Sequence, residues 1–145
     1  NNSELLEQLA LAKMNTVISC SVLDEMVGFH ILRNSQNILG ERKVLLQKGV
    51  TIVENWIQRN TEFIEWVRPN AGALCCVRLR PDVFTDAEVN NFYSHAGNAQ
   101  IQLASGEWFG ERKRVFRLGF GFLPLPLLEQ ALSLLEDTLR KTKGS

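Results

Sequence analysis

The sequence predicts an α+β fold: a small, mainly antiparallel sheet that is covered on one face by helices and preceded by long helices. Apolar residues recur at helical spacing over 4–14, 22–59 and 124–143. Between these segments, residues 63–122 change to extended runs separated by Pro, Asn and Gly. The composition, with 45% hydrophobic and 22% charged residues, is that of an ordinary globular chain. Helices and strands in separate blocks favour this α+β class.

The long helical stretch at 22–59 needs an interruption. A helix of about 38 residues would be about 57 Å long at about 1.5 Å per residue, more than the width of a small domain. We therefore expect a break near 33–37 and a second helix over 35–59, long enough to reach from one structural unit to another. Ser21 and Asp24 form a capping arrangement at the start of the first helix.

Turn residues divide the central part of the chain. Residues 63–81 contain two extended runs joined by Arg-Pro-Asn-Ala-Gly, and a third run is expected within 99–104. Thr85 and Glu88 form a T-x-x-E capping box, which predicts a helix start at this point. This helix is expected to stop at Gly97, a residue type favoured just after a helix end.

The final strand, within 115–122, places an arginine on its polar side. Strand side chains alternate between two faces, and the apolar face is expected to pack on the terminal helix through Leu128, Ala131 and Leu135. The apolar face comprises Phe116, Leu118, Phe120 and Phe122, and the other face comprises Val115, Arg117, Gly119 and Gly121. Two interpretations of Arg117 stay open from the residues alone: a pair with a cross-strand carboxylate, or a planar fork that binds a ligand carboxylate.

The remaining composition argues against several kinds of function. Sixteen basic and sixteen acidic residues give no net charge that would attract nucleic acid or an anionic membrane. Cys75 and Cys76 are interpreted as buried structural thiols, and the cysteine usage fits a reducing, cytoplasmic location. His30 and His95 show no metal-ligand spacing and no partners for nucleophilic catalysis. We predict no catalytic residue and no metal site within this chain.

Five segments in order resemble the C-terminal part of a fold-type-I, PLP-dependent aminotransferase of the class I/II group. They are NTVISCSVLDE, ILGERKVLLQKGVTIVENWI, VRPNAGALCCVRL, SGEWFG and FRLGFG. The second resembles the interdomain helix of that family, and the last resembles its arginine-bearing strand. The resemblance implies that Arg117 binds the substrate α-carboxylate. It also implies that 1–34 is the tail of the large PLP-binding domain and 35–145 is the C-terminal small domain.

The same resemblance implies an enzyme that moves an amino group between an amino acid and a 2-oxo acid, with pyridoxal 5'-phosphate as cofactor and a homodimer as the full-length form. The family's Schiff-base lysine lies in a segment before the first helix of this chain, and Lys13 does not match its motif. Ser105 stands where the family commonly has proline. We therefore expect this chain alone to be inactive and not to bind PLP, because the large domain is missing.

Two alternatives remain at this point. The same fold hosts PLP-dependent lyases, synthases and decarboxylases, because fold does not determine the reaction. A stand-alone α+β module that binds a carboxylate ligand at Arg117 would have the same sequence pattern.

Overall fold

The computed structural model describes residues 2–16 and 21–144 of the chain. The segment between the predicted helices over 4–14 and 22–59 therefore lies partly outside the described residues. The elements, in chain order, are α1 (Ser3–Thr16), α2 (Val22–Arg33), α3 (Ser35–Arg59), β1 (Ile64–Trp66), β2 (Leu74–Leu79), α4 (Asp86–Asn98), β3 (Ala104–Ser105), the 3-10 helix η1 (Gly106–Phe109), β4 (Val115–Gly119) and α5 (Leu125–Lys143).

The chain divides into two compact units, one up to Glu41 and one from Arg42 onward, so that the division falls inside α3. In the first unit, α1 and α2 bury none of their described residues. The Ser21 hydroxyl accepts a hydrogen bond from the Asp24 amide, 3.5 Å away, as the capping arrangement predicts. The predicted break before the long helix is confirmed at residue 34. The domain boundary at 34/35 stays a prediction.

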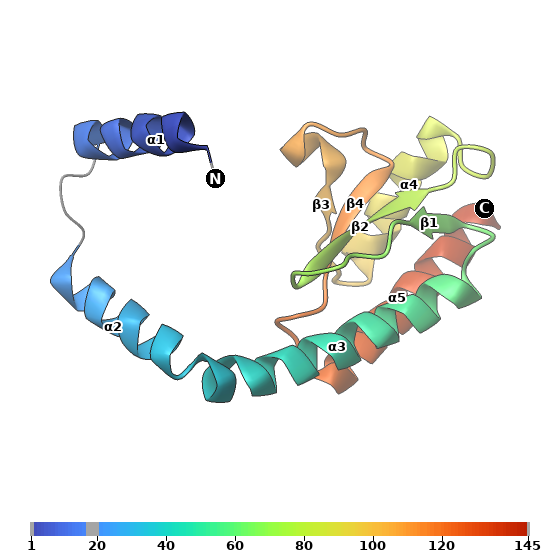
Figure 1. Cartoon of the computed structure of the whole chain (residues 1–145). Coiled ribbons are helices and arrows are strands. Elements are labelled where there is room, and N and C mark those ends of the chain that lie inside the picture. The colour runs from blue at the N-terminus through green and yellow to red at the C-terminus, as the bar shows by residue number, and fades with distance from the viewer. Residues whose placement is uncertain (1, 17–20, 145) are drawn as a thin grey trace. The chain divides into compact units, whose positions relative to one another are not determined.

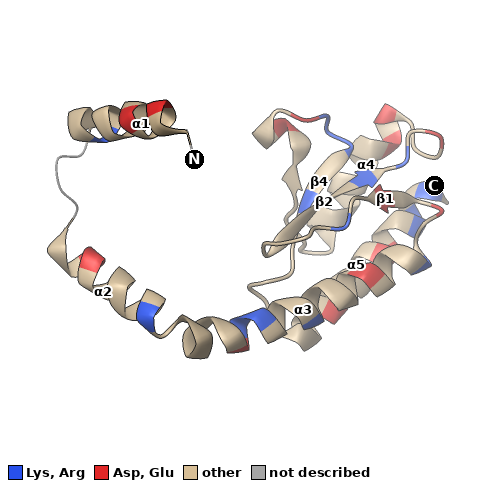
Figure 2. Ribbon diagram, viewed as in Figure 1, with Lys and Arg blue, Asp and Glu red and all other residues tan. Residues whose placement is uncertain are grey.

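The unit from Arg42 onward is built on a four-stranded sheet with the order β1-β2-β4-β3, in which every neighbouring pair is antiparallel. Helices α3, α4 and α5 contribute side chains to one core with the buried side of this sheet, and Figure 1 shows the helices gathered on that side. The predicted α+β class is confirmed. Figure 2 shows basic and acidic residues interspersed over this unit.

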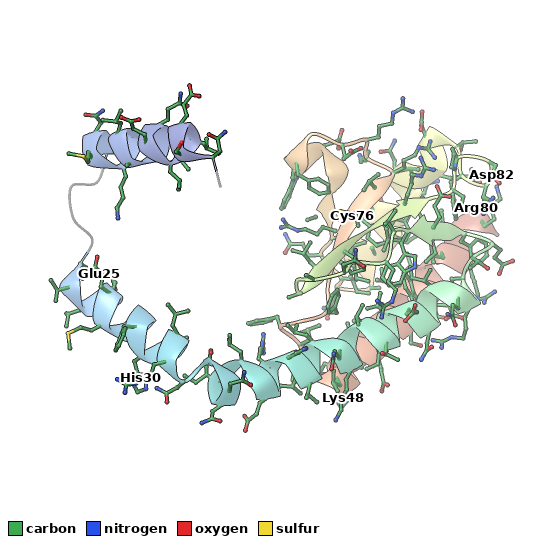
Figure 3. The ribbon with its side chains drawn as sticks, viewed as in Figure 1. Glu25, His30, Lys48, Cys76, Arg80 and Asp82 are labelled. Atoms are coloured by element: carbon green, nitrogen blue, oxygen red, sulfur yellow. The ribbon has the colours of Figure 1, made fainter. Side chains whose placement is uncertain are left out.

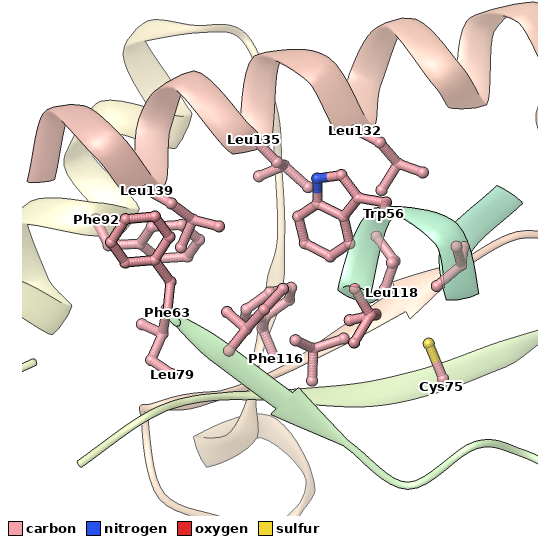
Figure 4. Close-up of a cluster of buried hydrophobic side chains, with 14 of the residues drawn as sticks. Trp56, Phe63, Cys75, Leu79, Phe92, Phe116, Leu118, Leu132, Leu135 and Leu139 are labelled. Carbon is pink, nitrogen blue, oxygen red and sulfur yellow. The ribbon is translucent and has the colours of Figure 1, made fainter. Parts of the chain in front are cut away.

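Side chains alternate between the two faces of the central strands β2 and β4, and those on one face are buried (Figure 4). Trp56 of α3 and Phe92 of α4 are almost fully buried against this face, and the rings of Phe92 and Phe116 lie 5.5 Å apart. The strand residues in this core are Ile64, Cys75, Val77, Leu79, Phe116 and Leu118, and the connector residues are Phe63, Phe84 and Phe120.

The prediction for the last strand is confirmed for three of its four apolar residues and wrong for Phe122. Strand β4 ends at Gly119, and the chain bends before α5. Because alternation holds only while the backbone stays extended, Phe122 loses its place on the core face and is 92% exposed. The third predicted run is also shorter than expected, since β3 consists of Ala104 and Ser105 alone.

Helix α5 faces the core with a stripe rotated slightly from the predicted one. Leu128 and Leu135 are buried as predicted, while Ala131 is half-buried and Leu127, next to Leu128, is 50% exposed. Leu132 takes the central place because it lies four residues after Leu128 and three before Leu135, the spacing of one helix face.

Helix α4 begins as predicted and ends later than predicted. The Thr85 hydroxyl accepts from the Glu88 amide, and the Glu88 carboxylate accepts from the Thr85 amide 2.8 Å away, which completes the capping box. Gly97 is not the stop, because the helix continues to Asn98. Gln100 adopts the left-handed backbone (φ 60°) after the helix end, and the Ile101 amide then donates to the Ala96 carbonyl.

Replacing Phe120 with alanine is expected to lower the free energy of unfolding by about 3 to 5 kcal/mol, because the ring is 3% exposed and its removal leaves a cavity. Urea unfolding of the purified chain measures this loss. The matched control is Phe122→Ala, which removes an exposed ring and is expected to change the free energy by less than about 0.5 kcal/mol. A loss below about 1 kcal/mol for Phe120→Ala contradicts the packing described above.

The Glu88 carboxylate is expected to make stability depend on pH. Hydrogen bonds from the Thr85 amide and hydroxyl and from Lys143 lower the pKa of Glu88 from 4.5 to about 2. A lowered pKa in the folded state means that this stabilisation is present above about pH 4.5 and is lost as the pH falls toward 2. The urea concentration at the unfolding midpoint is therefore expected to fall less steeply between pH 4.5 and about 2 in Glu88→Gln than in the wild type. Glu129→Gln, at an exposed position of α5, is the control and is expected to leave the wild-type slope.

Candidate functional site

Arg117 lies in the middle of β4, on the face of the sheet that the helices leave uncovered. Its neighbours along the strand, Phe116 and Leu118, are buried in the core, so the arginine side chain points to the opposite side and is exposed. Strands β2 and β3 flank it, and its Cα partners are Cys76 on one side and Ala104 on the other. The predicted placement of Arg117 on the polar face is confirmed.

The hydrogen-bond pattern brings Arg117 and Cys76 close together. The Phe120 amide donates to the Ala73 carbonyl at 2.9 Å, which makes these two residues a hydrogen-bonded pair. Hydrogen-bonded and non-hydrogen-bonded pairs alternate along an antiparallel ladder, so Arg117 and Cys76, three positions away, form a non-hydrogen-bonded pair. Side chains are nearer in such pairs, with Cα atoms about 4.5 Å apart.

Arg117 has no acidic cross-strand partner. Its two partners in the ladder, a cysteine and an alanine, carry no carboxylate, and no described side chain forms an ion pair with its guanidinium. The interpretation of Arg117 as half of a cross-strand ion pair therefore fails within the described residues. The Arg117 side chain is exposed, and a planar carboxylate can bind two of its five N–H donors.

The next arginine on the same face shows the contrast. Arg78 is the Cα partner of Glu65 in β1, and the two side chains form a hydrogen-bonded ion pair. Arg78 thus has a carboxylate partner on the adjacent strand, whereas Arg117 has none among the described residues. Elsewhere in this unit Arg68 pairs with Glu54 at 3.0 Å, and Arg80 pairs with Asp82 at 2.8 Å (Figure 3).

The two glycines that follow Arg117 differ in their surroundings. A Cβ atom on Gly119 would meet no atom within 4 Å, so the space beside the arginine is open. A Cβ atom on Gly121 would lie 2.5 Å from Ala73 Cβ, so this glycine is required by packing within the chain. Only Gly119 leaves room for an incoming ligand.

The two adjacent cysteines have opposite environments, and the prediction that both are buried is wrong for one of them. Cys75 is buried, and burial, followed by the neighbouring Cys76, raises the pKa of its thiol to about 12. Cys76 is exposed on the Arg117 face (Figure 3). Alternation alone indicates opposite faces for adjacent strand residues, but only the register identifies Cys76 as the neighbour of Arg117.

Neither histidine belongs to a strand of this sheet. His30 is exposed on α2, and the Nδ1 atom of His95 lies 3.1 Å from the Thr142 hydroxyl oxygen, which joins α4 to α5. Within residues 2–16 and 21–144, no cluster of three or more His, Cys, Asp or Glu side chains could hold a metal ion. Over the same residues, no helix has the length and apolar character needed to cross a membrane.

The strands around Arg117 contain no lysine: none occurs in β1 to β4. Lys143 donates to the Val83 carbonyl and to Glu88, and the ammonium of Lys113 lies 5.8 Å from the ring centre of Tyr93. An exposed guanidinium without an ion-pair partner among the described residues has the donors that a carboxylate can bind.

No protein-family model and no functionally curated protein matches the sequence of this chain. Solved structures match its fold. A PLP-dependent aminotransferase from Streptococcus suis has 23% identity and a TM-score of 0.72, with 97% of this chain and 36% of that chain covered. LysN, an α-aminoadipate aminotransferase from Thermus thermophilus, has 16% identity and a TM-score of 0.75, with 97% and 36% covered. The PLP-dependent cyclase OrfR has 24% identity and a TM-score of 0.74, with 95% and 37% covered.

The predicted resemblance to the C-terminal, small-domain part of PLP-dependent aminotransferases is thus confirmed for the fold. The chain spans about 36% of the length of the first two solved structures it matches. At sequence identities below 25%, these structural matches establish the fold and do not establish the function. The function has to be argued from the site itself.

Proposed function

We propose that this chain is the C-terminal segment of a PLP-dependent aminotransferase and that Arg117 binds the α-carboxylate of the amino acid or 2-oxo acid substrate. The observation that carries the proposal is the exposed guanidinium of Arg117, without an acidic partner among the described residues, on the uncovered face of a sheet with this fold. The proposal includes a large domain beyond this chain and a homodimeric full-length form, as the resemblance implies, and a cytoplasmic location, as the cysteine usage indicates.

The role of Arg117 follows from the shape of its side chain. A guanidinium presents two parallel N–H donors to a carboxylate, which fixes both the position and the orientation of the acid. Gly119 and Ala104 beside it have little or no side chain, so the ligand can approach the sheet closely. Orienting the substrate in this way can lower the activation free energy of a reaction substantially.

The amino-transfer chemistry would come from outside the described residues. PLP acts as an electron sink when it is bound, and the protein contributes orientation and electrostatics. In this proposal the lysine and the phosphate-binding groups belong to the large domain. The chain alone is then inactive and does not hold the cofactor.

A second candidate keeps the carboxylate site and changes the reaction. One solved structure with this fold is the PLP-dependent cyclase OrfR. The second candidate is therefore a PLP-dependent lyase, synthase, decarboxylase or cyclase. Because Arg117 binds the acid and takes no part in bond cleavage, its geometry is compatible with each reaction. Product analysis of the complete polypeptide with an amino acid, with and without a 2-oxo acid, separates transamination from the others.

Arg117→Lys in the complete polypeptide is expected to lower kcat/KM by about tenfold to a hundredfold. The variant keeps the charge and one donor but loses the fork, and the second charge-assisted hydrogen bond contributes about 1.5 to 3 kcal/mol. Steady-state kinetics measure the effect, and the absorbance of bound PLP is expected to stay unchanged. Arg117→Ala is expected to be worse.

The matched control is Arg78→Lys, on the same face and already paired with Glu65, which is expected to change kcat/KM by less than about threefold. In the chain alone, Arg117→Ala is expected to change the free energy of unfolding by less than about 0.5 kcal/mol, because the side chain is exposed. Near-wild-type kcat/KM for Arg117→Lys would rule out the carboxylate assignment.

The purified chain is expected to show no specific reaction with PLP. After PLP is added, the visible spectrum is expected to be that of the free cofactor with weak, scattered lysine labelling. Borohydride reduction and peptide mapping measure the site and yield of any pyridoxyl-lysine. One lysine labelled at stoichiometric yield would show that the chain holds its own cofactor site and would refute this part of the proposal.

A further inference from the structure

One face of helix α3 lies against the chain segment that leaves β4. The contacting residues of the helix are Arg42, Leu46 and Gly49, which are spaced by four and three positions and therefore lie on the same side. They meet Phe120 and Gly121, the two residues directly after the strand that carries Arg117. Figure 1 shows this connection passing α3 before α5 begins.

The contact at Gly49 is between backbones. A Cβ atom at position 49 would lie 2.6 Å from the carbonyl oxygen of Phe120, closer than any side chain is tolerated. On the other side, a Cβ atom at Gly121 would lie 2.7 Å from Leu46 Cδ2 and 2.5 Å from Ala73 Cβ. The backbone at 120–121 is therefore held between α3 and the start of β2.

A charged hydrogen bond closes the same contact. The guanidinium of Arg42 donates to the carbonyl oxygen of Gly121, and the Phe120 amide donates to the Ala73 carbonyl at 2.9 Å. The segment directly after β4 is thus bonded to the helix through Gly121 and, through Phe120, to Ala73, the residue directly before β2. Arg117 is three residues upstream on a strand whose exit is fixed at both points.

We propose that Arg42 and Gly49 are positioning residues for Arg117: they hold the exit of β4 against α3, so that the helix and the arginine-bearing strand keep one relative position. Arg42 is also the first residue of the second compact unit, at the point where α3 enters it. The consequence for catalysis rests on the proposed function of Arg117; the contact itself does not.

The contact is tested in the purified chain by amide hydrogen exchange, which reports local opening. Arg42→Met removes the donor and keeps the length of the side chain, and the Phe120 amide is expected to exchange about threefold to tenfold faster. Lys43→Met, at the next exposed position of α3, is the control and is expected to leave this exchange rate unchanged. Equal Phe120 exchange in the wild type and in Arg42→Met would overturn the proposal.

Gly49→Ala gives an independent second test. The added methyl displaces the Phe120 carbonyl, and the amides of Phe120 and Leu118 are expected to exchange at least tenfold faster. Gly40→Ala is the matched control on the same helix, since a Cβ atom there would meet nothing within 4 Å. Unchanged exchange in Gly49→Ala, with a fold intact by circular dichroism, would also overturn the proposal.

Kinetics of the complete polypeptide test the positioning role. Arg42→Met is expected to raise KM for the amino acid substrate by about threefold to tenfold, to change kcat by less than twofold, and to be partly restored in Arg42→Lys. Faster exchange together with an unchanged KM would refute positioning. If Arg117→Lys itself leaves kcat/KM unchanged, the proposed function fails instead, and the exchange results still decide whether the contact holds.

Discussion

The burial of one face of the sheet is the constraint on which the unit from Arg42 onward depends. Phe116 and Leu118 each contribute about 1.5 to 3 kcal/mol by leaving water for the core formed with α3, α4 and α5. A shift of one residue in β4 would expose both and would bury Arg117 without a partner, which costs several kcal/mol more. The hydrophobic pattern therefore fixes the register, and the register places the guanidinium on the open face.

Exposure also limits what Arg117 can do within this unit. A solvent-exposed arginine–carboxylate pair contributes only about 0 to 1 kcal/mol, because water competes for both groups and salt screens them. The same pair becomes several times stronger when another surface excludes water from it. The small residues beside Arg117, Gly119 and Ala104, leave space for such a surface. An open face with an arginine that lacks an acidic partner among the described residues is therefore suited to a site that is completed from outside the unit.

Local sequence signals predict much of the fold, and distant contacts decide the rest. The capping box at Thr85 and the apolar alternation through Phe120 are confirmed, because each depends on residues close together in the chain. Phe122 leaves the core because the strand ends three residues before it. The site shows the same division: alternation places Arg117 on the polar face, but only the register shows that Cys76, and not a carboxylate, lies opposite it in β2.

The two glycines after Arg117 show how one short motif serves two purposes. In sequence, Gly119 and Gly121 occupy equivalent positions on the polar side of the predicted strand. In the structure, Gly121 admits Leu46 of α3 and Ala73 against the backbone, whereas Gly119 faces open space. The strand is therefore fixed by close packing at its exit and unobstructed beside the arginine. A rigid support under an accessible guanidinium is the arrangement that precise binding of a carboxylate requires, because a side chain can orient a ligand only as well as its own backbone is held.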